Sequence, residues 1–402
     1  MINLEIPNKL KPLIEQAHVV GSAVFRPISR KYDRAEHSYP KELDMLAAVM
    51  DGFSEAGAGG GVSNVKQGTR DKGDKSVRNG ANMSTVLGMV ELCWGDTGLA
   101  LSIPRQGLGN AAVAAVATPE QKARWGQVWA AMAITEPGAG SDSAAIRTTA
   151  RLEGNEWVIN GEKIYVTAGE RATAVVVWAT LDRNMGRAAI KSFFVPKGSP
   201  GMQLVRLDKK LGIRASDTAV LSFNDCRIPK DNILGSPEID TKKGFGGVMQ
   251  TFDNTRPIVA AMALGVARAS LEVTETFLKE AGVDTRMRGS RWTQHAATAE
   301  LHRMKAELEA ARLLTLKAAW MADNGIPNSV EASMAKAKAG RTANEVTLRC
   351  VELCGATGYG ETELLEKWAR DSKILDIFEG TQQIQLLIVA RNLLGLKSNE
   401  LR

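Results

Sequence analysis

The hydrophobic period of this 402-residue chain changes twice, and these two changes restrict the folds that it can adopt. Up to about residue 128, apolar side chains recur with the 3.6-residue period of helices. From there to about residue 236, polar and apolar residues alternate as they do in strands, and the helical period then returns. We therefore expect an α+β fold with an N-terminal helical domain at residues 1–128, a middle antiparallel β domain at 129–236 and a C-terminal helical bundle at 237–402.

The N-terminal part contains helical patterns separated by one long polar stretch. The patterns cover residues 9–35, 41–56 and 83–93. A further helix should begin at Thr118-Pro119, because Thr is a good N-cap and Pro suits the first helical position. Residues 57–82 are rich in Gly, Lys, Asp and Asn, and we expect a mobile or substrate-covering loop there.

The middle and C-terminal parts carry the strand signals and the longest apolar stripes. We expect a β-hairpin turn at Asn160-Gly161 and strands at 191–195 and 218–223. The C-terminal stripes cover residues 245–262, 291–323, 328–353 and 381–394. Helices this long and apolar pack as a bundle, and the excess of apolar surface predicts burial between subunits.

Composition and charge exclude several classes of protein. The chain is 44% hydrophobic and 24% charged, which is typical of soluble globular proteins. Its 51 Lys and Arg against 45 Asp and Glu give a net charge of +6 with no dense basic run, so nucleic-acid binding has little support. No apolar run is long enough to insert into a membrane. A mild positive field would fit an anionic small substrate, although a plain soluble surface explains it equally well.

The cysteines and the N-terminus indicate a reducing compartment. Four scattered cysteines are too few for a disulfide framework. Cys350 and Cys354 share a helical face, but no second thiol pair accompanies them, so we expect buried core residues rather than metal ligands. The first residues show no apolar signal segment and include Glu5 and Glu15. We expect a cytoplasmic protein.

The first segment that could contribute to a functional site is MAITEPGAGSD at residues 132–142. Gly138 and Gly140 could open a dinucleotide-binding loop, but strand patterns follow them where that motif requires a helix. The segment is either a Gly-rich turn at the start of the β domain or a loop whose N–H groups and hydroxyls, at Thr135 and Ser141, face a planar polar ligand.

Two further segments interrupt the C-terminal helical pattern. FDNTRP at 252–257 is either a surface helix start or a polar functional insertion. In the segment 374–385, Glu379 precedes Gly380, which would supply a turn, and Thr381, which would cap the next helix. Glu379 is either a favourable charge near that helix start or a general base whose proton affinity rises with desolvation.

These three segments, in this order, resemble the signatures of the acyl-CoA dehydrogenase family. The matching stretches are TEPGAGSD (135–142), GEKIYVTAG (161–169), LGIRASDT (211–218), IPKDNILG (228–235), FDNTRP (252–257) and FEGTQQIQ…VAR (378–391). The resemblance implies a homotetramer with non-covalent FAD and a C-terminal four-helix bundle. It also implies α,β-dehydrogenation of an acyl-CoA thioester to trans-2-enoyl-CoA, with electrons passed to an electron-transferring flavoprotein.

The resemblance also assigns roles to individual positions. Glu379 would remove the α-proton while the β-hydride passes to flavin N5, and its own N–H with a flavin ribityl hydroxyl would stabilise the developing oxyanion. The remaining cofactor positions would be Met132, Ile134, Thr135, Ser141, Tyr165, Thr167, Gln294, Glu352, Gly355, Ala356, Thr381 and Gln383. The substrate positions would be Ser141, Phe252, Asp253, Arg256 and Gly380.

Some positions depart from the family pattern. Met132 stands where an aromatic residue is usual, and Tyr165 where Trp is usual. The Arg-x-x-Phe motif that grips the FAD pyrophosphate is absent, so Arg286 or Arg288 would replace it. Glu352 replaces a frequent Gln and Ala356 a Gly. Thr255 occupies the position of an alternative base, which leaves Glu379 as the one base at a recognised position.

Two other functions remain open from the sequence. A relative that reoxidises its flavin with oxygen, as an oxidase or monooxygenase, would share much of the pattern. The altered positions near the adenylate end would also suit a half-site subunit that completes a partner's FAD site.

Overall fold

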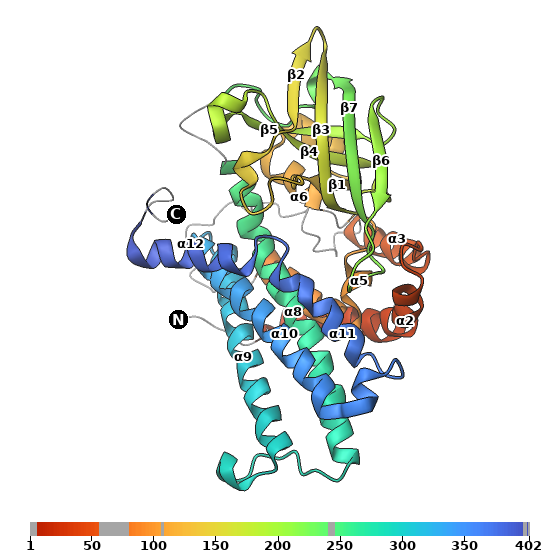
Figure 1. The fold of residues 1–402 in the computed structure, drawn as a ribbon, viewed down its shortest axis with the longest axis vertical. Helices are drawn as coiled ribbons and strands as arrows, with labels where there is room; N and C mark the ends of the chain where they lie inside the picture. The colour runs from red at the N-terminus through yellow and green to blue at the C-terminus, as the bar shows by residue number, and fades with distance from the viewer. Residues whose placement is uncertain (1–5, 56–79, 106–107, 240–245, 397–399, 401–402) are drawn as a thin grey trace.

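The computed structural model describes residues 6–55, 80–105, 108–239, 246–396 and 400. The expected loop at 57–82 lies outside these ranges except for its last three residues. The described parts show a β-sheet above a bundle of long helices, with the N-terminal helices beside both (Figure 1). The α+β fold with a C-terminal helical bundle is therefore confirmed, while the domain boundaries stay a prediction.

The N-terminal part is helical, as the pattern predicts. Its helices are α1 (Lys11–Val19), α2 (Arg26–Arg34), α3 (Glu42–Glu55), α4 (Ala81–Gly95), α5 (Thr97–Ala100), α6 (Leu108–Val116) and α7 (Pro119–Trp125). A short π-helix at Val20–Phe25 joins α1 to α2. Thr118 caps α7 in a capping box with Gln121, which confirms the predicted helix start.

The sheet is mixed rather than wholly antiparallel. Its strands are β1 (Ala130–Ala133), β2 (Thr149–Glu153), β3 (Glu156–Thr167), β4 (Ala174–Thr180), β5 (Ile190–Pro196), β6 (Met202–Leu207) and β7 (Thr218–Pro229). They follow the order β1-β4-β2-β3-β7-β6, with β5 also paired to β4. Both β1 and β2 run parallel to β4, so the antiparallel expectation is wrong for these pairs. The long stretches of chain that separate each of them from β4 permit this direction.

The predicted hairpin at Asn160-Gly161 is wrong. The turn between β2 and β3 lies at Gly154-Asn155, and β3 continues through Asn160-Gly161 with a bulge opposite β7. Gly161 has φ +152°, and a Cβ there would lie 2.4 Å from the Thr148 hydroxyl. The glycine thus permits a close approach inside a strand, which local turn preferences do not distinguish from a hairpin.

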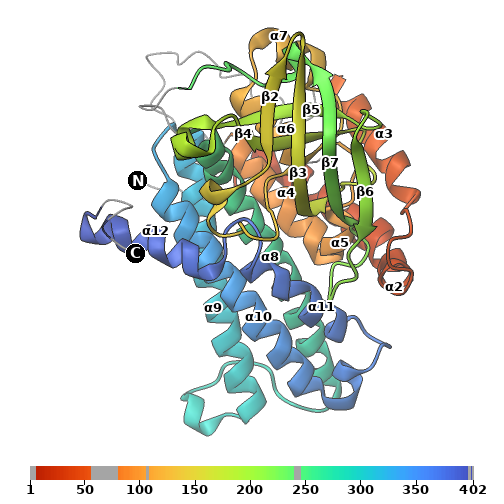
Figure 2. The same cartoon turned by 45° about the horizontal axis from the view of Figure 1, so that its top comes forward.

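Two N-terminal helices, α6 and α7, cover one face of the sheet, and the C-terminal helices form a separate bundle. Ala112 and Val113 of α6 and Trp125 of α7 pack against Val176 and Phe194 of the sheet, and Figure 2 shows both helices behind the strands. The C-terminal helices are α8 (Gly246–Glu280), α9 (Ala296–Asp323), α10 (Ser329–Tyr359), α11 (Leu365–Ser372) and α12 (Gln382–Leu394).

The long helix α8 forms the centre of the bundle. Pro257 lies inside it and both Thr255 and Arg256 are buried, so the alternative of a surface helix start at FDNTRP is wrong. The segment Thr255–Glu280 is long and apolar enough to cross a membrane by composition, but 78% of that window is buried inside the protein. This burial is typical of a core helix in a globular fold.

A buried ion cluster joins the three parts of the chain. Lys367 of α11 donates to Asp96, at the start of α5, at 2.7 Å and also contacts Asp371. Asp371 in turn accepts from the backbone N–H of Ile213, in the connection between β6 and β7. Because these groups are shielded from water, the cluster fixes how the sheet sits on the bundle next to residues 373–381.

Candidate active site

Glu379 lies in a tight turn between the 3₁₀ turn Lys373–Asp376 and α12. Its φ is +56° and that of Gly380 is +88°, so two successive residues adopt left-handed backbone. For a residue with a side chain this conformation costs about 1–2 kcal/mol and persists only where surrounding contacts enforce it. Thr381 caps α12 by accepting from the Ile384 N–H at 3.4 Å, so the predicted turn and cap are confirmed.

The Glu379 carboxylate is half-buried and held by a hydroxyl. Thr255 of α8 donates to Glu379 Oε2 at 2.7 Å. Burial raises the pKa of Glu379 above its usual value, and the Thr255 hydrogen bond and the positive charges of Arg256 and Lys336 partly offset that rise. A raised pKa makes this carboxylate a stronger base than an exposed glutamate.

Other donors hold the backbone of the same turn. Gln385 Nε2 donates to the carbonyl oxygens of Glu379 and Gly380, both at 3.1 Å. Lys336 Nζ of α10 donates to the Gly380 carbonyl at 2.7 Å. Sequence reasoning missed Lys336 and Gln385. ASMAKAKAG places two lysines among small residues, and the sequence does not distinguish Lys336, which is buried, from Lys338, which pairs with Glu307.

The β domain brings three of the predicted cofactor residues together, Ile134, Thr135 and Tyr165. The Ile164 N–H donates to the Thr135 carbonyl at 2.9 Å, and Lys163 Nζ donates to the Ile134 carbonyl at 3.0 Å. These bonds lay the segment after β1 beside the end of β3. The β3 register shifts between Lys163 and Val166, so Tyr165 is pushed out of the strand with φ +57° and stays 65% exposed.

The remaining predicted β-domain residues lie around this pair of segments. Thr167 ends β3 and is half-buried. Met132 is half-buried on β1 and packs with Ile134 against the cluster beneath α6. Ser141 is exposed on the Gly-rich loop after Thr135.

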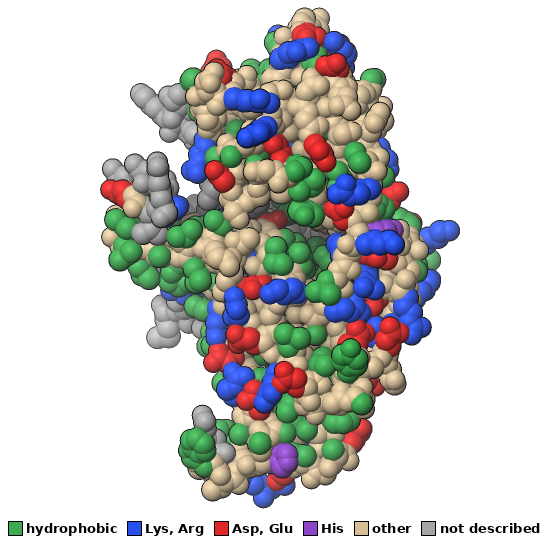
Figure 3. Space-filling model, viewed as in Figure 1, with side chains coloured by type: hydrophobic (Ala, Val, Ile, Leu, Met, Phe, Trp, Pro, Cys, Tyr) green, Lys and Arg blue, Asp and Glu red, His purple; other side chains and the backbone are tan. Residues whose placement is uncertain are grey.

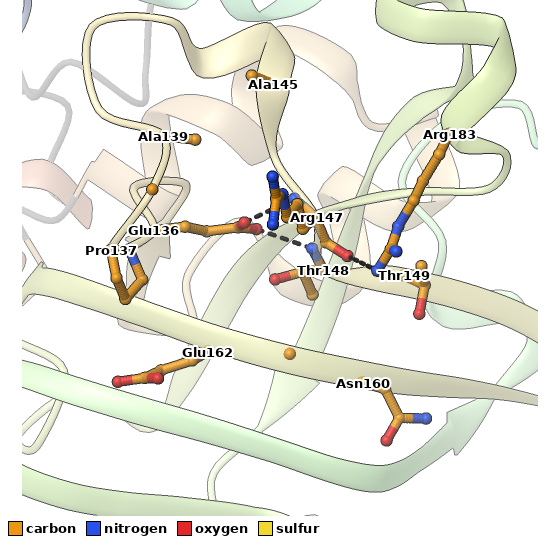
Figure 4. A pocket seen from close by; sticks show the side chains of 12 residues that line it. Glu136, Pro137, Ala139, Ala145, Arg147, Thr148, Thr149, Asn160, Glu162 and Arg183 are labelled. Carbon is orange, nitrogen blue, oxygen red and sulfur yellow. Dashed lines mark hydrogen bonds between the residues drawn. The ribbon is translucent and has the colours of Figure 1, made fainter.

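A cavity of about 450 Å³ opens beside that Gly-rich loop (Figure 4). Glu136 accepts from the backbone N–H groups of Arg147 at 2.6 Å and Thr148 at 2.9 Å, which ties the loop to β2. It also pairs with buried Lys163 at 2.7 Å, whose pKa burial lowers to about 8. Arg183 reaches across the opening to the Arg147 carbonyl at 2.7 Å. The cavity therefore combines a fixed carboxylate with flanking basic side chains.

The predicted substrate residues on α8 are described only in part. Phe252 and Asp253 belong to the helix, but their side chains lie outside the described residues. Arg256 is buried, and its Nη1 lies 3.5 Å from the Ser333 hydroxyl of α10. It therefore faces the interior beneath Glu379. Figure 3 shows a hollow in the surface between the sheet and the bundle.

Six predicted cofactor residues lie at the far end of the bundle. They are Arg286, Arg288 and Gln294 between α8 and α9, and Glu352, Gly355 and Ala356 near the end of α10. Gly355 lies about five helical turns, or ~28 Å, along α10 from Lys336. Within one chain the structure therefore does not bring these residues to Glu379, whereas Thr381 and Gln383 begin the helix that follows it.

Both candidate arginines pair with one carboxylate. Asp284 accepts from Arg286 Nε at 2.8 Å, and Arg288 Nε lies 3.5 Å from it. Glu352 pairs with Arg349. Nearby, Met287 and Trp292 are 67% and 81% exposed, so large apolar side chains face outward beside these polar groups. Such a rim of exposed apolar and basic side chains is typical of an interaction surface.

The described ranges contain no candidate metal centre. No group of three or more His, Cys, Asp or Glu side chains there could hold a metal ion. Cys350 and Cys354 are buried free thiols, which confirms the prediction of core residues, and burial raises the pKa of Cys350 to about 12.

Comparison with known proteins finds one family. Residues 131–226 match the acyl-CoA dehydrogenase middle domain and residues 242–394 the acyl-CoA dehydrogenase C-terminal domain. The short-chain specific acyl-CoA dehydrogenase of Bos taurus mitochondria is 34% identical over 98% of this chain and 92% of its own length.

Solved structures agree with this match. Butyryl-CoA dehydrogenase from Megasphaera elsdenii superposes with a TM-score of 0.83 at 29% identity, covering 98% of this chain and 100% of its own. A chain from the structure of an electron transferring flavoprotein of Acidaminococcus fermentans also gives a TM-score of 0.83, at 30% identity, with coverage of 98% and 100%.

Proposed function

This chain belongs to the acyl-CoA dehydrogenase family, and from that premise we propose that it converts short-chain acyl-CoA thioesters to trans-2-enoyl-CoA with FAD as cofactor. The observation that carries this proposal is the setting of Glu379. It is a half-buried carboxylate with a raised pKa, held by Thr255 in a left-handed turn. These properties suit a base that must remove a weakly acidic α-proton.

The same residue would also stabilise the charge that proton removal creates. As the α-proton leaves, negative charge develops on the thioester oxygen. Among the described residues the Glu379 N–H has no hydrogen-bond acceptor, and it stands in a turn of fixed geometry. A preorganised N–H of this kind contributes about 3 kcal/mol when it meets an oxyanion. Glu379 would thus supply both the base and one donor.

The residues present fit a bound FAD. Tyr165 is extruded beside Thr135 at the lower end of the sheet, where an aromatic side chain and a hydroxyl can meet a flat ring. Thr135, Tyr165 and Thr167 would hold the flavin ring, and Thr381 and Gln383 would approach the rest of the cofactor. Bound FAD would supply the two-electron acceptor for the β-hydrogen.

The adenylate end of FAD would require a second copy of the chain. Gly355, one of the six predicted residues at the far end of the bundle, lies about 28 Å along α10 from Lys336, which contacts the Glu379 turn. Exposed Trp292 and Met287 surround them. This separation supports a homo-oligomer in which one chain presents its α8–α9 connection to the cofactor of another. We propose a tetramer, because four copies allow each chain to use this surface and a second bundle face.

The substrate and the electron acceptor follow from the relatives. The protein of Bos taurus is named as short-chain specific and that of Megasphaera elsdenii as a butyryl-CoA dehydrogenase, so we propose straight acyl chains of about four carbons. The chain from the electron transferring flavoprotein structure supports a flavoprotein of that class as acceptor. The basic side chains at the cavity of Figure 4 are compatible with an anionic thioester.

The test is anaerobic titration of the purified protein with straight and branched acyl-CoAs while the flavin absorbance is recorded. We expect bleaching by butyryl-CoA, and reoxidation when an electron-transferring flavoprotein is added. Rapid reoxidation by air alone would favour the oxidase alternative. The control is Glu379→Gln, which should keep the oxidised flavin spectrum and lose flavin reduction. Normal reduction in that variant would show that Glu379 is not the base.

A further inference from the structure

Three lysines are almost wholly buried in the described part of the chain, and one of them differs from the others. Lys163 pairs with Glu136, and Lys367 pairs with Asp96 and Asp371. Lys336 is equally buried but forms no ion pair within 4.0 Å among the described residues. Because an unpaired buried ammonium is strongly disfavoured, a residue retained in this form needs another explanation than packing.

The Lys336 ammonium is directed at the turn that carries Glu379. Its Nζ donates to the Gly380 carbonyl at 2.7 Å, one residue after the proposed base. Gln385, which has no exposed surface, donates from one Nε2 to the carbonyls of both Glu379 and Gly380. The two successive left-handed residues are therefore fixed from α10 on one side and from the first turn of α12 on the other.

We propose that Lys336 is a positioning residue for the dehydrogenation, acting with Gln385 as a clamp on the Glu379 and Gly380 carbonyls. The clamp keeps the turn in its left-handed form, which orients both the carboxylate and the N–H of Glu379. It also places a positive charge beside the base, which favours the ionised carboxylate. The inference rests on the proposed role of Glu379 as the α-proton base.

The charges around Lys336 define the pH behaviour. Asp376 of the 3₁₀ turn and Glu379 face it with negative charge, and Arg256 of α8 faces it with positive charge. Asp376 is itself shared with Arg341 at 3.5 Å and Lys373 at 3.9 Å. Burial lowers the pKa of Lys336 to about 8, so the ammonium is charged at neutral pH and loses its charge in mildly alkaline solution.

The sign of the effect on Glu379 follows directly. A nearby positive charge lowers the pKa of a carboxyl group, and Lys336 is one of the charges that lower that of Glu379. Removing the ammonium should therefore raise the pKa of Glu379. The acidic limb of the kcat–pH profile, along which the base becomes ionised, should move to higher pH.

The experiment compares Lys336→Met, Lys336→Arg and Lys338→Met with the wild-type holoenzyme, measuring kcat and KM for butyryl-CoA from pH 5.5 to 9. For Lys336→Met we expect kcat about tenfold lower or more, KM within about threefold, and an acidic limb about half a pH unit or more higher. Lys336→Arg keeps the positive charge, so the acidic limb of its kcat–pH profile should lie at the same pH as in the wild type. Lys338 is the matched control, because it lies two residues further on α10 and pairs with Glu307 instead.

Each other outcome contradicts the clamp. One such outcome is that Lys336→Met lowers thermal stability or flavin content while the pH of the acidic limb, kcat and KM all stay at their wild-type values. In that case the lysine has only a structural role. If Lys336→Met does not fold, Lys336→Gln, which keeps a donor but no charge, decides by the same pH profile. Glu379→Gln separates the two proposals. Activity in that variant overturns the proposed base, whereas its inactivity together with a wild-type Lys336→Met profile overturns the clamp alone.

Discussion

The Thr255 hydroxyl donates to Glu379 Oε2 at 2.7 Å, across 124 positions of sequence. The bond connects the middle helix of the bundle to the turn before the last helix. It places a neutral donor on one oxygen of the carboxylate that would accept the α-proton. A hydroxyl in this position stabilises the ionised carboxylate and fixes its orientation before substrate arrives.

Thr255→Val should weaken the base at acidic pH. The Thr255 hydrogen bond lowers the pKa of Glu379, so its loss should raise that pKa by about one unit, since a hydrogen bond to a charged group contributes about 1.5 kcal/mol. The kcat–pH profile for butyryl-CoA checks this, with the acidic limb moving upward. Thr255→Ser is the control, because it keeps the hydroxyl and should keep the profile. Equal shifts in the two variants would contradict the role of the hydrogen bond.

The local chemistry of the turn could be predicted because it lies within one segment. Glu379, Gly380 and Thr381 are adjacent, and each has a conformational preference that its neighbours reinforce. The partners of the turn could not be predicted in the same way. Thr255 and Lys336 reach it from α8 and α10 only through the packing of the bundle, and no local pattern encodes that arrangement.

The sheet shows the same limit. Alternation of polar and apolar residues located the β domain, but it did not reveal that β1 and β2 run parallel to β4. Strand direction depends on how distant segments pair. Asn160-Gly161 has the composition of a hairpin turn, yet the glycine is required where β3 passes Thr148. Pairing of β3 with β7 along its whole length therefore overrode the local turn preference.

Replacing the base should stabilise the protein at neutral pH. The folded-state pKa of Glu379 is raised by burial, so the folded protein binds the proton more tightly than the unfolded chain does. The resulting destabilisation is absent below the unfolded pKa of about 4.3 and complete above the folded value. Glu379→Gln should therefore raise Tm at pH 7 and leave it unchanged at pH 4, as measured by calorimetry. A lower Tm at pH 7 would contradict the burial effect.

Gly380→Ala should damage catalysis and stability together. At φ +88° a Cβ is strained, and it would lie 2.5 Å from Gln385 Nε2. We expect a loss of about 1–2 kcal/mol in the free energy of unfolding and a lower kcat, because the carbonyl contacts of the turn must shift. Gly88→Ala in α4 is the control, since nothing lies within 4 Å of a Cβ there. That variant should be neutral or slightly stabilising.

Trp292→Ser should separate the copies of the chain and empty the cofactor site. Trp292 is 81% exposed in the same α8–α9 connection as Arg286 and Gln294, which the family resemblance assigns to FAD binding. If a second copy covers this surface, removing the indole costs about 2 kcal/mol or more per contact. Size-exclusion mass and flavin absorbance per chain should then fall together.

Leu152→Ser is the matched control, because Leu152 is 44% exposed on β2, away from the bundle. Unchanged mass and full flavin content in Trp292→Ser would show that the far end of the bundle is an ordinary surface and that FAD is held within one chain.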